Sequence, residues 1–154
     1  MIAVDTNMLV YAHHEASPLH KKAKYQLTES VNSSVGWGIP VFCIGEFLRV
    51  ITHPKVFSNP YTPSEAIEAL ARLVQAPTLK LLYPSANYLS LLASAIRETN
   101  AAGNLVFDAQ IVAVCRENGV TALLTEDQDF DRFHKFTTKP NTCLLYTSPS
   151  PRDS

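Results

Sequence analysis

The sequence predicts an α/β domain with a central, mostly parallel β-sheet and α-helices on both of its faces. Short apolar segments alternate along the chain with longer segments in which apolar residues recur every three or four positions. The short segments are typical of strands buried on both faces, and the longer ones are typical of helices with one apolar face. This alternation favours parallel strands, because each helix carries the chain back to begin the next strand in the same direction.

The N-terminal half begins with a strand over residues 2–4 (IAV), and a helical segment follows Asp5. Three further helices are expected from their boundary residues and their apolar faces. They cover residues 19–31 after Pro18, residues 40–53 between Pro40 and Pro54, and residues 62–75 from the Thr62-Pro63 start. Proline suits the first turn of a helix, where no backbone hydrogen bond is lost, and it interrupts a helix elsewhere.

The C-terminal half alternates strands and helices. The strands cover residues 78–83 (TLKLLY) and 120–125 (VTALLT), and the helices cover residues 86–100 and 108–119. The last helix is expected to end at Gly119, because glycine readily adopts the left-handed conformation that is common just after a helix.

Composition indicates one globular domain. The chain has 154 residues, of which 46% are hydrophobic and 18% are charged. No apolar stretch approaches the roughly 18 residues of a membrane span, and the N-terminus lacks the pattern of a secretory signal. Three cysteines without a CxxC spacing fit a reducing compartment. We therefore expect a soluble, cytoplasmic protein with no membrane contact.

Residues 143–154 differ in character from the rest of the chain. The stretch from Cys143 to Asp153 looks like the in-frame translation of a transposase sequencing-library adapter, and its end is rich in serine and proline. We therefore take residues 1–142 as the domain and expect residues 143–154 to be a non-native tail. Such a tail is either disordered or, through Leu144 to Tyr146, imitates a last strand. A natural polar tail is the alternative.

Carboxylates directly follow two of the predicted strands. Asp5 comes after the first strand, and Asp127 and Asp129 come after the last one. Functional groups of parallel α/β sheets gather beyond the carboxyl ends of the strands, so these acids converge if the two strands are neighbours. Each also has a plainer role, because Asp5 suits a helix N-cap and the segment EDQDFDRF suits a solvated turn.

Two more acids lie on predicted helices. Glu46 has mostly apolar neighbours in VFCIGEFLRVI, so it is expected to be buried and to need a partner, since an isolated buried carboxylate is costly. That partner is either a bound group or Arg49, three residues further on. Asp108 either caps the helix that it opens or points with Ile111 toward the sheet.

Together these acids indicate a site for a hard cation. Carboxylates without a matching set of His or Cys suit Mg²⁺ or Mn²⁺ rather than zinc. A net charge of -1 gives no general attraction to nucleic acid, so a bound cation would supply the positive field that a phosphate backbone needs. The same cation would activate a water for in-line attack on phosphorus, which favours phosphodiester cleavage as the reaction.

In their order along the chain, these acids resemble those of PIN-domain ribonucleases, specifically the VapC toxins of bacterial toxin-antitoxin pairs. The likeness extends roughly from Ile2 to Lys139. It rests on segments that stand in register with the family's motifs, namely VDTNMLVYA, GEFLRVITHPKVF, FDAQIVA and LLTEDQDF. It departs at the end, where the family continues into a last strand and this chain enters the adapter-like tail.

The resemblance implies a PIN-like domain whose site residues have distinct roles. The residues that would bind the metal and organise the attacking water are Asp5, Glu46, Asp108 and Asp127, with Asp129 as a secondary ligand and Asn7 and Thr125 as hydrogen-bonding supports. It also implies an Mg²⁺- or Mn²⁺-dependent endoribonuclease that cuts structured RNA such as tRNA or rRNA. Such proteins commonly form homodimers and are inhibited by a VapB-type antitoxin.

Other residues and functions stay open. Arg49, His53 and Lys55 are expected to contact RNA phosphates. The sequence leaves open whether Trp37 stacks on a base or an antitoxin side chain, and Phe107 is assigned to the core with most other phenylalanines. One alternative function is a haloacid-dehalogenase-like phosphatase, which would need a second acid where Asn7 stands. The other is a catalytically silent module that binds RNA or protein.

Overall fold

The computed structural model describes residues 1–120, 122–133 and 137–139. Its centre is a five-stranded sheet in which every pairing is parallel and the strand order is β3-β2-β1-β4-β5. The strands are β1 (Ile2–Val4), β2 (Trp37–Pro40), β3 (Leu79–Leu82), β4 (Ala122–Leu124) and β5 (Thr137–Lys139). The predicted α/β class with a parallel sheet is confirmed.

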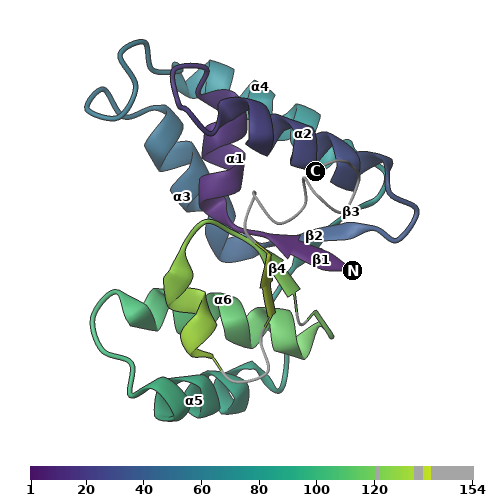
Figure 1. Ribbon diagram of the computed structural model, residues 1–154, viewed down its shortest axis with the longest axis vertical. Helices are drawn as coiled ribbons and strands as arrows, with labels where there is room; N and C mark the ends of the chain where they lie inside the picture. The colour runs from purple at the N-terminus through teal and green to yellow at the C-terminus, as the bar shows by residue number, and fades with distance from the viewer. Residues whose placement is uncertain (121, 134–136, 140–154) are drawn as a thin grey trace, which may run out of the picture.

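Helices cover both faces of this sheet. Figure 1 shows α1 to α4 on one side and α5 with α6 on the other, as the alternation of elements predicts. The α-helices are α1 (Thr6–His13), α2 (His20–Asn32), α3 (Val41–Ile51), α4 (Pro63–Val74), α5 (Tyr88–Thr99) and α6 (Leu105–Glu117), and a short 3₁₀ helix, η1, spans Gln128–Arg132.

The predicted helix boundaries have clear local causes. Thr62 caps α4 in a capping box, because its hydroxyl accepts a hydrogen bond from the Glu65 amide and the Glu65 carboxylate accepts one from the Thr62 amide. After α6, Gly119 adopts a φ of +73° and the Val120 amide donates to the Cys115 carbonyl. Glycine therefore ends α6 at the predicted place.

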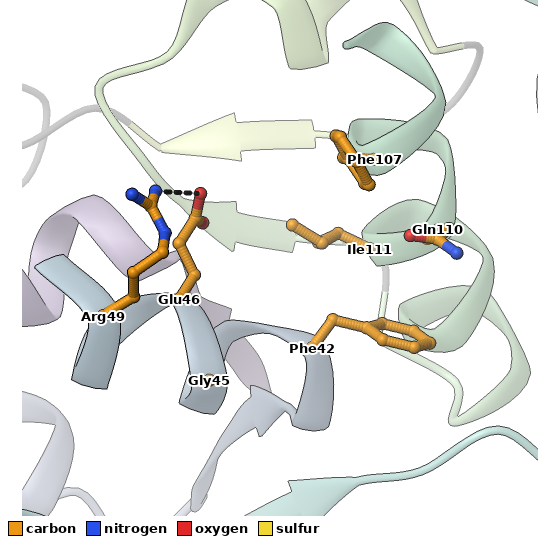
Figure 2. A pocket seen from close by; sticks show the side chains of 7 residues that line it. All are labelled: Phe42, Gly45, Glu46, Arg49, Phe107, Gln110 and Ile111. Atoms are coloured by element: carbon orange, nitrogen blue, oxygen red, sulfur yellow. Dashed lines mark ion pairs between the residues drawn. The ribbon is translucent and has the colours of Figure 1, made fainter. Parts of the chain in front are cut away.

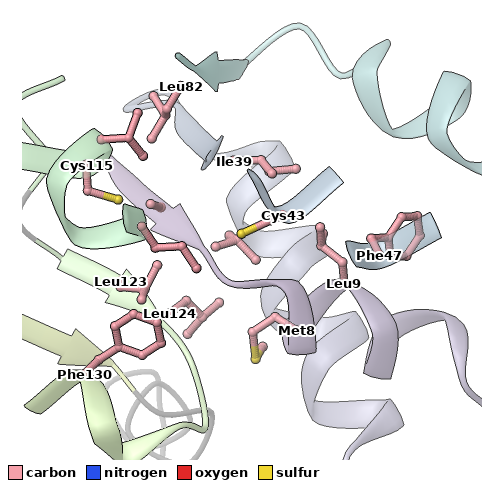
Figure 3. Packing of buried hydrophobic residues seen from close by; sticks show 14 of the residues in the cluster. Met8, Leu9, Ile39, Cys43, Phe47, Leu82, Cys115, Leu123, Leu124 and Phe130 are labelled. Atoms are coloured by element: carbon pink, nitrogen blue, oxygen red, sulfur yellow. The ribbon is translucent and has the colours of Figure 1, made fainter. Parts of the chain in front are cut away.

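The core lies between the sheet and the two helical layers. Ile39 of β2, Leu82 of β3 and Leu123 of β4 are completely buried, and Figure 3 shows them packed among side chains from the helices. Cys43 and Cys115 are free, buried thiols, and burial raises the pKa of Cys115 to about 12. These two cysteines contribute to packing and are held in the neutral form.

The strand order places a crevice at the carboxyl end of β1. The chain adds β2 and then β3 on one side of β1, and it returns to add β4 on the other side. The loops after β1 and β4 therefore leave the sheet in different directions, and ligands of open parallel sheets bind at such switch points. This is the end of the sheet at which Asp5 and the acids after β4 lie.

Several details differ from the sequence prediction. Strand β2 was not predicted, because Gly38 and Pro40 disfavour strands and Pro40 was placed at the start of the following helix. Trp37 belongs to this strand and is fully buried, which answers the open question against its stacking on a base or an antitoxin side chain. Helix α6 begins at Leu105, before the predicted start at Asp108. The predicted tail and its strand-like segment lie outside the described residues.

Among the described residues, no helix is both long enough and apolar enough to cross a membrane.

Candidate active site

Asp5 lies at the end of β1 and is both a helix cap and a buried acid. It is the N-cap of α1, where its Oδ1 accepts a hydrogen bond from the Thr6 amide over 2.7 Å. Its Oδ2 accepts a second hydrogen bond from the Thr125 hydroxyl over 2.8 Å. Only 5% of its surface is exposed. The capping role expected for Asp5 therefore coexists with a fixed position at the crevice.

The segment after β4 continues this hydrogen-bonded chain outward. Thr125 is buried, and its hydroxyl accepts a hydrogen bond from the Asp127 amide over 3.0 Å. Asp127 caps η1 and accepts a hydrogen bond from the Asp129 amide over 2.9 Å. These two hydrogen bonds therefore position Asp127 and Asp129 in the loop after β4. Because β1 and β4 are paired neighbours, the acids that follow them meet at one edge.

Asp108 reaches the same place from α6. It lies in the first turn of that helix, beyond the N-cap Asn104, so it is not the cap residue. One carboxylate oxygen from each of Asp108, Asp127 and Asp129 lies within 4.8 Å of the other two. Three carboxylates at this spacing offer oxygen ligands to a single cation, which is the donor set that Mg²⁺ and Mn²⁺ prefer.

The electrostatics of this cluster oppose full ionisation. Burial raises the pKa of Asp5 to about 6, although hydrogen bonds from Thr125 and Thr6 favour the charged form. Burial also raises the pKa of Asp108 to about 7, and the nearby carboxylates, led by Asp127, add to the rise. A positive charge bound among these carboxylates would stabilise their ionised forms.

A single hollow of about 520 Å³ connects all of the predicted acids. Its lining comprises Asp5, Asn7, Glu46, Arg49, Asn104, Phe107, Asp108, Ile111, Asp127 and Asp129. Asn7 lies in the first turn of α1, and its side chain faces the hollow from an exposed position. The structure thus brings together six of the residues predicted from the sequence, together with Arg49.

Glu46 enters the hollow from α3, but it is not buried. Half of its side chain (52%) is exposed, and it forms an ion pair with Arg49 over 3.8 Å. The expectation of a buried Glu46 is wrong, because the surrounding apolar residues of α3 turn to other sides of the helix. The ion-pair interpretation is correct, and it leaves the Glu46 carboxylate at the edge of the acidic hollow.

The remaining candidates separate into two groups. Arg49 lines the hollow, whereas His53 and Lys55 do not and lie in the turn after α3, where the Lys55 amide donates to Nδ1 of His53. Three lining residues were missed as site residues, namely Asn104, Phe107 and Ile111. Phe107 is 65% exposed, so its assignment to the core is wrong. The signal for it was available, because Phe107 and Ile111 share a helix face beside Asp108.

Comparisons with known proteins agree with this arrangement. Residues 2–135 match the PIN domain family. The VapC ribonuclease Mb2897 of Mycobacterium bovis is 32% identical over 135 residues, which cover 88% of this chain and 91% of that protein. Ribonuclease VapC48 of Mycobacterium tuberculosis is 31% identical over 134 residues, covering 84% of this chain and 89% of that protein.

Solved structures show the same fold at lower sequence identity. VapBC2 from Rickettsia felis, bound to a DNA fragment from its promoter, superposes with a TM-score of 0.67 at 16% identity and covers 91% of this chain and 98% of its own. VapC20 of Mycobacterium tuberculosis, a Sarcin-Ricin loop cleaving toxin, gives a TM-score of 0.64 at 17% identity and covers 88% of this chain and 98% of its own.

Proposed function

This chain belongs to the PIN domain family, and we propose that it is a metal-dependent endoribonuclease toxin of the VapC type that cleaves structured RNA such as tRNA or rRNA. The observation that carries the proposal is the meeting of Asp108, Asp127 and Asp129 within 4.8 Å, in the same hollow as Asp5 and Glu46. Because the chain belongs to the PIN domain family, we no longer consider the haloacid-dehalogenase-like phosphatase. A module that only binds RNA or protein would have no need of a cluster of carboxylates that repel one another.

The donor set fits a divalent hard cation. Asp108, Asp127 and Asp129 each offer a carboxylate oxygen, and no His or Cys lines the hollow among the described residues. Asp5 completes the set from the end of β1, with both of its oxygens oriented by hydrogen bonds. We propose Mg²⁺ or Mn²⁺ as the ion, because oxygen ligands suit these ions and because the pKa of Asp108 is raised by burial and, beyond that, by nearby carboxylates whose negative field either ion would relieve.

A bound divalent ion supplies charge for the phosphate oxygens and lowers the pKa of a water molecule. The remaining roles, which include orienting the attacking water, fall to other side chains of the hollow. Glu46 stands apart from the three close carboxylates and its side chain is half exposed, so we assign it to orienting the attacking water and accepting its proton. Asn7 contributes an amide on the same wall of the hollow.

RNA binding rests on local rather than overall charge. Arg49 lines the hollow and can move from the Glu46 carboxylate to a phosphate oxygen, because their ion pair is exposed and long. His53 and Lys55 lie in the turn after α3, and we propose that they contact phosphates further along the RNA. With a net charge of -1, the chain has no other general attraction for a polyanion.

We also propose a VapB-type antitoxin as the protein partner, supported by the VapBC complexes among the structural neighbours. The homodimer and the cytoplasmic location stay predictions of the resemblance and of the cysteine pattern. Sedimentation of the purified chain tests the homodimer directly.

The metal half of the proposal is tested by titrating the protein with Mn²⁺ and following free Mn²⁺ by electron paramagnetic resonance. Wild-type protein should bind Mn²⁺, and Asp127→Asn should weaken that binding at least tenfold. Glu68→Gln on α4 is the matched control, because it removes an exposed acid away from the hollow. Equal Mn²⁺ binding by wild type and Asp127→Asn would contradict the assignment. The catalytic half is tested by RNA cleavage in Mn²⁺ against EDTA.

A further inference from the structure

A second hollow of about 440 Å³ adjoins the acidic one between α3 and α6. Figure 2 shows its lining, which comprises Phe42, Gly45, Glu46 and Arg49 from α3 and Phe107, Gln110 and Ile111 from α6. Four of these residues also line the acidic hollow, namely Glu46, Arg49, Phe107 and Ile111. The two hollows therefore form one continuous surface, acidic at one end and aromatic at the other. The volume lies within the roughly 300–1,000 Å³ of small-molecule sites.

The lining offers flat apolar faces with polar groups beside them. Figure 2 shows the rings of Phe107 and Phe42 on either side of the Ile111 side chain. Phe107 is 65% exposed, and Phe42 is held by Tyr88, whose ring centroid lies 5.9 Å away. The amide of Gln110 and the charged groups of Glu46 and Arg49 also line this hollow. Aromatic faces with hydrogen-bonding groups nearby are what proteins use to hold an unpaired base.

Gly45 keeps this surface open at a cost to the helix. It is an exposed residue within α3, and its backbone needs no left-handed conformation. A Cβ added at Gly45 would meet no atom within 4 Å, so packing does not require glycine there. Glycine inside a helix is nevertheless less stable than alanine. What glycine provides at this position is free space over the hollow.

We propose that the hollow between α3 and α6 is a base-binding subsite, in which one unpaired nucleobase adjoining the scissile phosphate stacks on Phe107. The inference rests on the proposed nuclease function and names the part of the RNA that the site recognises. The proposal follows from the wall that the acidic hollow and this hollow share. A phosphodiester held at the acids carries its own nucleosides, and the adjoining surface reached past Glu46 and Arg49 is aromatic. Because only an unpaired base can turn out of its stack to reach this hollow, the preferred substrate should be RNA with a loop or a bulge at the cut.

The first test measures the affinity of fluorescein-labelled single-stranded RNA by anisotropy. The full chain carries Asp108→Asn so that the RNA stays intact. Adding Phe107→Ala should weaken binding roughly five- to a hundredfold, because stacking on the ring is lost. Phe107→Trp should retain the affinity. The matched control is Leu89→Ala, which removes another highly exposed apolar side chain, on α5, and should leave the affinity unchanged. Phe107 is exposed, so its loss leaves the fold intact.

The second test locates the base by photocrosslinking. RNA that carries one 5-iodouracil is bound to the same protein and irradiated, and the linked peptide is identified by mass spectrometry. A crosslink at Phe107 or Phe42 is the expected result. RNA that binds and is cut by the wild type but crosslinks elsewhere, with Phe107→Ala neutral, would overturn the subsite and leave the nuclease proposal standing.

Two further outcomes would overturn the base-binding subsite. If no RNA is bound or cut, both the subsite and the nuclease function are wrong. If Phe107→Ala leaves RNA binding and the base preference at the cut unchanged but weakens the association with an antitoxin peptide, the hollow is a peptide site and the base-binding inference is wrong.

Discussion

The hydroxyl of Thr125 donates a hydrogen bond to Oδ2 of Asp5 over 2.8 Å, although 120 residues separate them in sequence. The same hydroxyl oxygen accepts a hydrogen bond from the Asp127 amide over 3.0 Å. One buried threonine thus links the end of β1 with the loop after β4. The relative positions of Asp5 and Asp127 depend on this link.

Thr125→Val should destabilise the protein and lower its activity. Valine has nearly the same shape but no hydroxyl, so the buried Oδ2 of Asp5 loses the hydrogen bond that Thr125 donates. We expect a loss of roughly 1–3 kcal/mol in the free energy of unfolding near neutral pH, measured by urea denaturation. Thr125→Ser keeps the hydroxyl and should retain most of the stability. If the valine variant is as stable as the serine variant, the hydrogen bond does not position Asp5.

The metal-free protein should become less stable as the pH rises from about 4 to about 7. The pKa of Asp5 is raised from 3.8 to about 6 and that of Asp108 to about 7. The folded protein therefore holds these protons more tightly than the unfolded chain. Stability is fully present below about pH 4 and is lost as the pH passes through the raised pKa values. For Asp5 alone the loss is about 3 kcal/mol.

The measurement is the free energy of unfolding in EDTA across this pH window. Asp108→Asn removes one of the two raised carboxyls and should flatten the curve, whereas Glu68→Gln should not. At pH 7.5, Mn²⁺ at about a hundred times its dissociation constant should restore roughly 2.7 kcal/mol to the wild type. A curve for Asp108→Asn that parallels the wild type would contradict the raised pKa of Asp108.

Glu46→Gln and Arg49→Ala should reduce activity without reducing stability. Their ion pair is exposed and 3.8 Å long, so it is worth no more than about 1 kcal/mol. Glu46→Gln should lower kcat, because the carboxylate that accepts the proton is lost, and Arg49→Ala should mainly raise KM for RNA, because a phosphate contact is lost. Both are measured with one RNA substrate at saturating Mn²⁺. Full activity in either variant would remove that residue from the site.

Gly45→Ala should stabilise α3 while restricting the hollow beside it. Alanine is favoured over glycine inside a helix by roughly 1 kcal/mol, and its Cβ meets no atom within 4 Å. The free energy of unfolding should rise accordingly in urea denaturation. Gly45→Leu, which fills the hollow, should in addition weaken RNA binding. A Gly45→Ala variant that is less stable than the wild type would show that the backbone there has a need for glycine.

The sequence predicted the parallel sheet and the convergence of the acids, because both follow from local patterns. Acids that follow apolar parallel strands must lie at the carboxyl edge of the sheet, and only the adjacency of β1 and β4 was left conditional. The start of α4 at Thr62 and the end of α6 before Gly119 were predictable for the same reason, because a few neighbouring residues decide helix capping.

Features that depend on tertiary packing were not predictable. The segment Trp37–Pro40 combines Trp and Ile, which favour strands, with Gly and Pro, which disfavour them, and it becomes β2 because β1 and β3 pair with it on either side. Glu46 and Phe107 were both expected to be buried. Their helices are apolar around much of their circumference, so the sequence does not say which side meets the sheet and which side lines a hollow.

Cleavage of end-labelled total tRNA and rRNA tests directly whether the protein is a metal-dependent endoribonuclease. Wild-type protein and Asp108→Asn are incubated with Mn²⁺ or Mg²⁺, with EDTA as the metal-free control and Glu68→Gln as the control for loss of an acid elsewhere. We expect discrete fragments from the wild type and from Glu68→Gln, and none in EDTA or from Asp108→Asn. Fragments that persist in EDTA, or with Asp108→Asn, would contradict a metal-dependent nuclease centred on these acids, as would the absence of any cleavage by folded wild-type protein.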